Sequence, residues 1–139
     1  SELEDKIIAH KLGGTVTIAG HTSDMPAAYA LSDIVLAPST RPEAFGRVAA
    51  EASAMAKPVI VADHGGQRET VIEGETGTRA EPGSVTALTA CIRTLIHLRP
   101  EARAAMGQAG QAYIRENYSK KQLQTATLNV YGRLLLNKA

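Results

Sequence analysis

The feature that most limits the fold is a pair of short, wholly apolar runs, Ile34–Ala37 and Pro58–Ala62, each followed by a loop and a helical pattern. Strands that are apolar along their whole length have both faces covered, as in parallel sheets. A further strand is predicted at Thr15–Ala19. Short strands that alternate with helices favour an α/β fold with a doubly wound parallel sheet and right-handed crossovers. In such sheets, ligands bind beyond the carboxyl ends of the strands.

Helical patterns fill most of the remaining chain. Ahead of the last third they cover roughly residues 2–12, 24–32, 46–55 and 67–72. After a predicted turn at Glu75–Gly77 come three helices with few strand signals: one capped by Ser84, one from Pro100 to about Asn117, and one capped by Ser119. We expect the apolar stripe of the last helix to pack on a neighbouring element and interpret this helical C-terminal region as scaffold.

Composition excludes several classes of function. The 139 residues are 44% hydrophobic and 21% charged, which fits one soluble globular domain. A net charge of +1 with scattered basic residues gives no reason to expect a nucleic-acid partner. Cys91 is the only cysteine, so neither a disulfide framework nor a thiolate metal set is expected. No segment resembles a signal peptide or a membrane span.

The candidate ligand site is the run from Pro42 to Glu51, in which Glu43 and Glu51 flank Gly46. A loop here leads from a strand to a helix N-terminus, where free N–H groups and the helix dipole favour an anion such as phosphate. Ordinary structural roles compete with this interpretation. Glu43 could simply complement the helix dipole, worth about 0.3–1 kcal/mol. Glu51 could form a surface pair with Arg47, worth roughly 0.2–0.5 kcal/mol.

The small residues of this helix favour a ligand site. Alanines at 49, 50, 52 and 54 allow a close approach to a sheet, and Gly46 leaves backbone amides accessible. Glu51 then lies roughly 7 Å further along the helix, within reach of a sugar attached to a bound phosphate. The residues therefore predict a nucleotide whose phosphate rests on the helix N-terminus, with one carboxylate for each flanking polyol.

Several blocks of the sequence resemble one enzyme family. They are Gly20–Thr22, Asp33–Ser39, Pro42–Ala52, Lys57–Gly66, Glu73–Gly77 and Arg115–Ser119. In this order and spacing they are similar to the C-terminal, donor-binding half of a retaining GT-B glycosyltransferase, of glycosyl transferases group 1 (family 4). The resemblance implies a Rossmann-like half of a GT-B fold that binds a nucleotide-sugar donor, such as a UDP-sugar. It covers nearly the whole chain and does not identify the substrate.

The resemblance also implies roles for individual residues. Glu43 matches the first glutamate of the family's E-x7-E signature, which contacts donor-sugar hydroxyls and is our candidate catalytic residue. Glu51 matches the second, which takes the ribose hydroxyls. The other implied donor-binding residues act mainly through the backbone: Phe45 and Gly46 at the sugar, Arg47 and Val48 at the diphosphate, and His21 and Thr22 along the nucleobase. The Arg47 side chain has three open roles: pairing with Glu51, facing the phosphates, or pointing to solvent. Ala44 replaces a glycine common in the family, which could narrow the donor pocket.

Other parts of the family pattern are missing, so we interpret residues 1–139 as a single partial domain, truncated at its N-terminal side and without the acceptor-binding domain. The missing opening strands carry the basic residues that neutralise the leaving diphosphate in the family, so the isolated chain is expected to be inactive. Its exposed sheet edge favours a strand-exchanged homo-oligomer. We predict no metal and no cofactor besides the donor substrate, because no His, Asp or Glu group has metal-ligand spacing.

The partners expected are a nucleotide sugar and an unidentified acceptor: a lipid, a polysaccharide or a small molecule. The predicted location is the cytoplasm, with the inner face of the membrane as the alternative, reached peripherally and only by the full-length protein. A non-catalytic nucleotide-binding or scaffold module is the competing class, and a domain of an epimerase or phosphorylase is a third. His64-Gly65-Gly66 has two alternatives: a tight turn, or a cradle for an anion or the acceptor.

Overall fold

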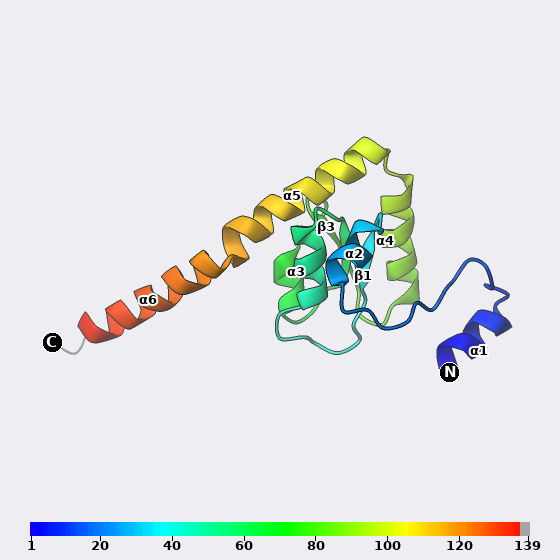
Figure 1. Ribbon diagram of the computed structural model, residues 1–139, viewed down its shortest axis with the longest axis horizontal. Coiled ribbons are helices and arrows are strands. Elements are labelled where there is room, and N and C mark those ends of the chain that lie inside the picture. The colour runs from blue at the N-terminus through cyan, green and yellow to red at the C-terminus, as the bar shows by residue number, and fades with distance from the viewer. Residues whose placement is uncertain (137–139) are drawn as a thin grey trace.

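The computed structural model describes residues 1–136, at whose centre lies a parallel sheet with helices on both faces (Figure 1). Its strands are β1 (Val35–Ala37), β2 (Val59–Ala62) and β3 (Gly77–Ala80), in the order β1-β2-β3. Val59 of β2 lies beside Val35 of β1 and Gly77 of β3. The parallel pairing and the helices on both faces confirm the predicted α/β class.

The side chains of β2 alternate between two separate cores. Val59 and Val61 lie in the core beneath α3 (Arg47–Ala54), and Ile60 packs with Leu95 of α4 (Val85–His97) on the opposite face. All four residues of β2 are buried, as predicted for a strand covered on both faces. The sheet therefore holds the N-terminus of α3 at a fixed position relative to the ends of β1 and β2.

Small residues bring α3 close to both its neighbours. Ala49 and Ala52 are fully buried in the core against the sheet, which confirms the predicted close approach. On the outer side lies α5 (Pro100–Tyr118), where a Cβ added at Gly107 would lie 2.0 Å from the Ala56 carbonyl oxygen. The α5 backbone thus lies directly against the chain that leaves α3.

Two predicted elements differ from the structure, and one strand was not predicted. Residues 15–19 form no strand: Val16 makes only an isolated bridge to Gly13, because no other strand among residues 1–136 pairs with this segment. No strand was predicted at Gly77–Ala80, yet β3 forms there by pairing with β2. The predicted helix at 67–72 is a 3-10 helix, η1 (Gly66–Thr70).

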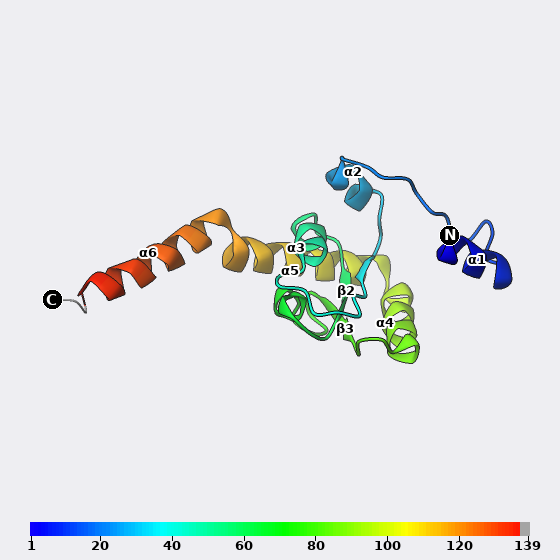
Figure 2. The ribbon, with the colours of Figure 1, turned by 90° about the horizontal axis from the view of Figure 1, so that it is seen from below.

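The remaining helices lie at the periphery (Figures 1 and 2). They are α1 (Glu2–Ala9), α2 (Met25–Ala30), which Asp24 caps as predicted, and α6 (Lys120–Leu136). Both figures show α6 extending away from the sheet, and none of its residues is buried. The prediction that its apolar stripe is covered by a neighbouring element was therefore wrong. Among residues 1–136, no helix is both long and apolar enough to span a membrane.

Candidate functional site

The loops that follow β1 and β2 pack directly on one another. The Gly66 amide donates a hydrogen bond of 2.8 Å to the Glu43 carbonyl, and His64 Nε2 lies 2.8 Å from the Ser39 carbonyl oxygen. Because both loops leave the carboxyl ends of parallel strands, this contact lies at the edge of the sheet where ligands were expected.

The two glycines of the second loop make this close packing possible. Gly65 has φ +60°, and a Cβ there would lie 2.6 Å from the Glu43 carbonyl oxygen. A Cβ at Gly66 would lie 2.1 Å from the Ala44 carbonyl oxygen. His64-Gly65-Gly66 forms a tight turn that packs on the Glu43 loop, and its alternative role as a cradle for an anion or the acceptor stays a prediction.

The N-terminus of α3 lies next to this contact and is open. Gly46 is its N-cap residue, in the left-handed region at φ 82°, and no side chain among residues 1–136 caps the helix. The first backbone N–H groups of α3 therefore remain free of side-chain acceptors, in the positive field of the helix dipole. A Cβ at Gly46 would lie 2.4 Å from Gln67 Cβ, so only glycine fits here.

The carboxylate before the helix is held by its own loop. Ser39 Oγ donates a hydrogen bond to Glu43 Oε1. Ser39 lies two residues after the end of β1 and four residues before Glu43, and both side chains are half-buried. The serine hydroxyl leaves the second carboxylate oxygen of Glu43 available for a ligand hydroxyl.

The second carboxylate is held from two sides. Tyr29 of α2 donates its hydroxyl to Glu51 Oε2 at 3.1 Å, and Arg47 Nη2 and Nε lie 2.9 and 3.2 Å from Glu51 Oε1. Among the three roles left open for the Arg47 side chain, the structure shows the pair with Glu51, although this side chain is 85% exposed. Burial, followed by the hydrogen bond and the negative charge of Glu51, raises the pKa of Tyr29.

Phe45 packs its ring against Tyr118, the last residue of α5. Its ring centroid lies 5.5 Å from that of Tyr118, and it borders a cavity of about 640 Å³ against α6. Tyr118 and Tyr113 both donate their hydroxyls to the Glu69 carbonyl, at 2.8 and 3.0 Å. Burial and the neighbouring Tyr113 raise the pKa of Tyr118 to about 12. The role of the Phe45 backbone at the donor sugar stays a prediction.

The predicted nucleobase loop lies apart from this cluster. His21 and Thr22 are exposed, and Thr22 Oγ1 accepts a hydrogen bond of 3.1 Å from the Asp24 amide at the start of α2. No hydrogen bond or ion pair within residues 1–136 joins either residue to the run from Glu43 to Glu51. Val48 is also exposed, at the first turn of α3. Their roles in binding stay predictions.

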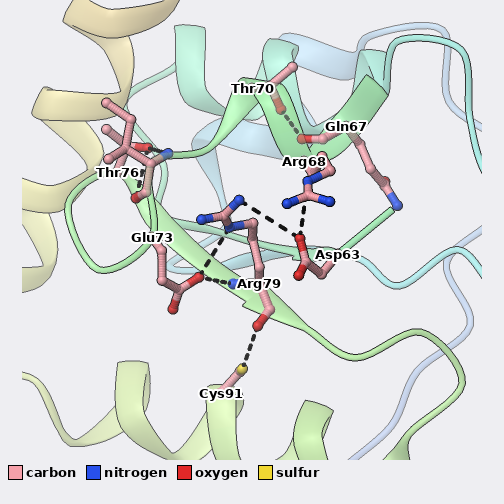
Figure 3. Close-up of polar contacts among 9 residues, drawn as sticks. Asp63, Gln67, Arg68, Thr70, Glu73, Thr76, Arg79 and Cys91 are labelled. Carbon is pink, nitrogen blue, oxygen red and sulfur yellow. Dashed lines mark hydrogen bonds and ion pairs between the residues drawn. The ribbon is translucent and has the colours of Figure 1, made fainter. Parts of the chain in front are cut away.

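A group of ion pairs lies beside η1 and β3 (Figure 3). Asp63 Oδ1 lies 3.4 Å from Arg68 Nε and 3.8 Å from Arg79 Nη1, and Arg79 Nε lies 3.5 Å from Glu73 Oε2. These partners neutralise one another, so the cluster presents no free charge of one sign. No three His, Cys, Asp or Glu side chains in the described part of the chain are grouped as a metal site.

Sequence reasoning missed three side chains of the site. Tyr29 and Ser39 hold the two glutamates, and Gln67 lies buried beneath Gly46. Tyr29 had one usable signal, because it is an aromatic residue in a small-residue helix that precedes the strand. Gln67 had none, because its burial results from the packing of two distant loops.

Comparison with known proteins identifies the family. The profile of glycosyl transferases group 1 matches residues 1–113. Glycogen synthase of Mycobacterium tuberculosis is 30% identical over 131 residues, which make up 93% of this chain and 31% of that protein. The GDP-mannose-dependent alpha-(1-6)-phosphatidylinositol monomannoside mannosyltransferase of Mycolicibacterium smegmatis is 37% identical over 101 residues, 68% of this chain and 26% of that protein. The structure of Anabaena Alr3699/HepE in complex with UDP-glucose matches with a TM-score of 0.83 at 32% identity, over 94% of this chain and 36% of that one.

The chain therefore belongs to the glycosyl transferases group 1 family, as the sequence blocks predicted. It spans between about a quarter and just over a third of the length of these three relatives.

Proposed function

We propose that this chain binds the nucleotide-sugar donor of a retaining glycosyltransferase, with the donor's diphosphate at the N-terminus of α3. The observation that carries the proposal is the open, uncapped end of α3, flanked by Glu43 before it and Glu51 within it. Amides and the helix dipole suit an anion, and carboxylates suit the hydroxyl groups on either side of it.

The sugar, the diphosphate and the ribose of the donor each have a partner in this arrangement. Glu43 receives the sugar hydroxyls, together with the backbone at Phe45 and Gly46. The amides of Arg47 and Val48 face the diphosphate, and Glu51 receives the ribose hydroxyls. The same amides would stabilise the charge that develops on the diphosphate as the glycosidic bond breaks, because oriented N–H dipoles act most strongly where charge accumulates in the transition state.

The relatives support a nucleotide sugar and leave its base open. One solved relative holds UDP-glucose, and one curated relative is described as GDP-mannose-dependent. Retention of anomeric configuration is also a proposal, which rests on the match of Glu43 and Glu51 to the family signature. The acceptor stays unassigned.

Calorimetric titration of the chain with UDP-, GDP- and ADP-sugars tests the proposal. We expect binding of at least one donor class, and we expect Glu51→Gln, which keeps an oxygen for Tyr29, to weaken it by roughly tenfold through loss of a charged hydrogen-bond acceptor. Glu75→Ala is the control, since it removes an exposed carboxylate just before the amino end of β3. The amino ends of the strands lie opposite the carboxyl ends, where the site is. A folded wild-type chain that binds none of these donors would favour the scaffold alternative.

A further inference from the structure

Three buried side chains among the described residues have unpaired polar atoms, Ser53, Gln67 and Thr78, and Gln67 is the one of them with two such atoms. It is fully buried at the start of η1, and neither its Oε1 nor its Nε2 has a hydrogen-bond partner among the described residues. An unpaired buried amide is costly, because it has lost its hydrogen bonds to water without replacement. Such a group in a native structure points to a role other than stability.

Two buried threonines close to Gln67 in the sequence are paired, whereas Ser53 Oγ and Thr78 Oγ1, like both polar atoms of Gln67, have no partner among the described residues. Thr70 Oγ1 donates to the Gln67 carbonyl at 2.7 Å, and Thr76 Oγ1 accepts from the Ile72 amide at 2.8 Å. Figure 3 shows both contacts, and it shows the Gln67 side chain extending away from the ion pairs of Asp63 and Arg68. The side-chain amide therefore does not belong to that cluster.

The position of Gln67 connects it to the proposed donor site. Its Cβ and Cα are the atoms that a Cβ at Gly46 would meet, at 2.4 and 2.8 Å. The residue before it, Gly66, binds the Glu43 carbonyl and touches Ala44 and Phe45. Gln67 thus lies against Gly46, in the turn that leads into the proposed anion site at the N-terminus of α3. A carboxamide has both a donor and an acceptor, so it can pair with either side of a peptide group in that turn.

We propose that Gln67 is a positioning residue of the donor site: its buried amide pairs with peptide groups of the Ala44–Gly46 turn when a nucleotide sugar is bound. This inference rests on the proposed function. A donor sugar that draws the N–H groups of Phe45 and Gly46 outward turns the carbonyls of the same peptides inward, toward Gln67 Nε2. The unpaired amide of the free protein is then satisfied only in the complex, which adds to the affinity for the donor.

Two variants, each of which replaces a buried polar side chain by an apolar one of similar shape, separate this role from a purely structural one. Gln67→Met replaces the amide by an apolar group of similar shape, and Thr78→Val does the same for another buried, unpaired group, Thr78 Oγ1 in β3. Removing an unpaired polar group favours the folded state, so neither variant is expected to have a lower melting temperature than wild type. Only Gln67→Met is expected to bind the donor more weakly, by roughly tenfold, the equivalent of about 1.4 kcal/mol.

The probe is the UDP-, GDP- or ADP-sugar that the wild-type 139-residue chain binds most tightly. Wild-type affinity in Gln67→Met, or an equal loss in Thr78→Val, overturns the inference while the proposed function stands. Absence of binding by wild type overturns both. In 15N-labelled wild-type protein, the side-chain NH2 protons of Gln67 are expected to shift downfield and to exchange more slowly when the donor is added. Resonances that do not move also overturn the inference, even if Gln67→Met fails to fold.

Discussion

Replacing Gly66 by alanine tests the contact between the two loops, on which the whole site depends. The added Cβ would lie 2.1 Å from the Ala44 carbonyl oxygen, 2.7 Å from its carbonyl carbon and 2.9 Å from Phe45 Cα. All three are backbone atoms, so no side chain can rotate away to relieve the overlap. Gly66 does not have a positive φ, so the cost of the substitution is steric.

The expected loss of stability follows from this overlap. Overpacking of a well-packed region costs about 1–3 kcal/mol. For a chain of this size, 1 kcal/mol corresponds to roughly 3 °C, so the melting temperature is expected to fall by roughly 3–10 °C. Donor affinity is expected to fall as well, because the loop that carries Glu43 must move. Thermal and urea unfolding followed by circular dichroism, together with calorimetric titration, measure both effects.

Gly132→Ala is the matched control for this experiment. Gly132 lies in α6, and a Cβ there would meet nothing within 4 Å. This substitution is expected to leave stability unchanged or to raise it by up to about 1 kcal/mol, because alanine favours a helix. A Gly66→Ala chain as stable as wild type, with unchanged donor affinity, would refute the packing of the two loops.

Two further predictions concern tyrosines around the site. Tyr29→Phe removes the hydroxyl that holds Glu51 and is expected to lower the free energy of unfolding, measured with urea, by about 1 kcal/mol. Arg47→Ala removes an exposed partner of Glu51 and should lower it by less than about 0.5 kcal/mol. The opposite order would contradict the assignment of Tyr29 as the main support of Glu51. Because the pKa of Tyr118 is raised to about 12, its native form stays protonated where the unfolded chain begins to ionise near pH 10. Its contribution to stability is thus complete below about pH 10 and is lost toward pH 12. In Tyr118→Phe, unfolding measured across this range should depend less on pH, and an unchanged dependence would exclude this cause.

The fold class and the two carboxylates could be predicted because their signals are local. Two continuous apolar runs identify strands covered on both faces, and the alternation with helices implies a parallel sheet. A loop after a strand, followed by Gly46 and a run of alanines, identifies an open helix N-terminus. Glu43 and Glu51 then lie on either side of it by spacing alone.

Strand pairing could not be predicted in the same way. Gly77–Ala80 contains one strong strand former, Thr78, beside depleted Gly and Ala, yet it forms β3 because β2 offers it backbone partners. Residues 15–19 have the better strand pattern but find no partner strand among residues 1–136. A strand is stable only with a neighbour, and that neighbour comes from elsewhere in the chain.

By itself, the sequence of this protein determined an α/β domain of the glycosyl transferases group 1 family and the positions of two glutamates beside a helix N-terminus. Only the tertiary structure decided which side chains support them: Tyr29, 22 residues before Glu51, and the paired glycines that bring Gln67 beneath Gly46. The physical reason is that apolar runs, caps and glycines act over a few residues. The hydrogen bonds and backbone contacts of the site, in contrast, join loops that become neighbours only when parallel strands end at the same edge of a sheet.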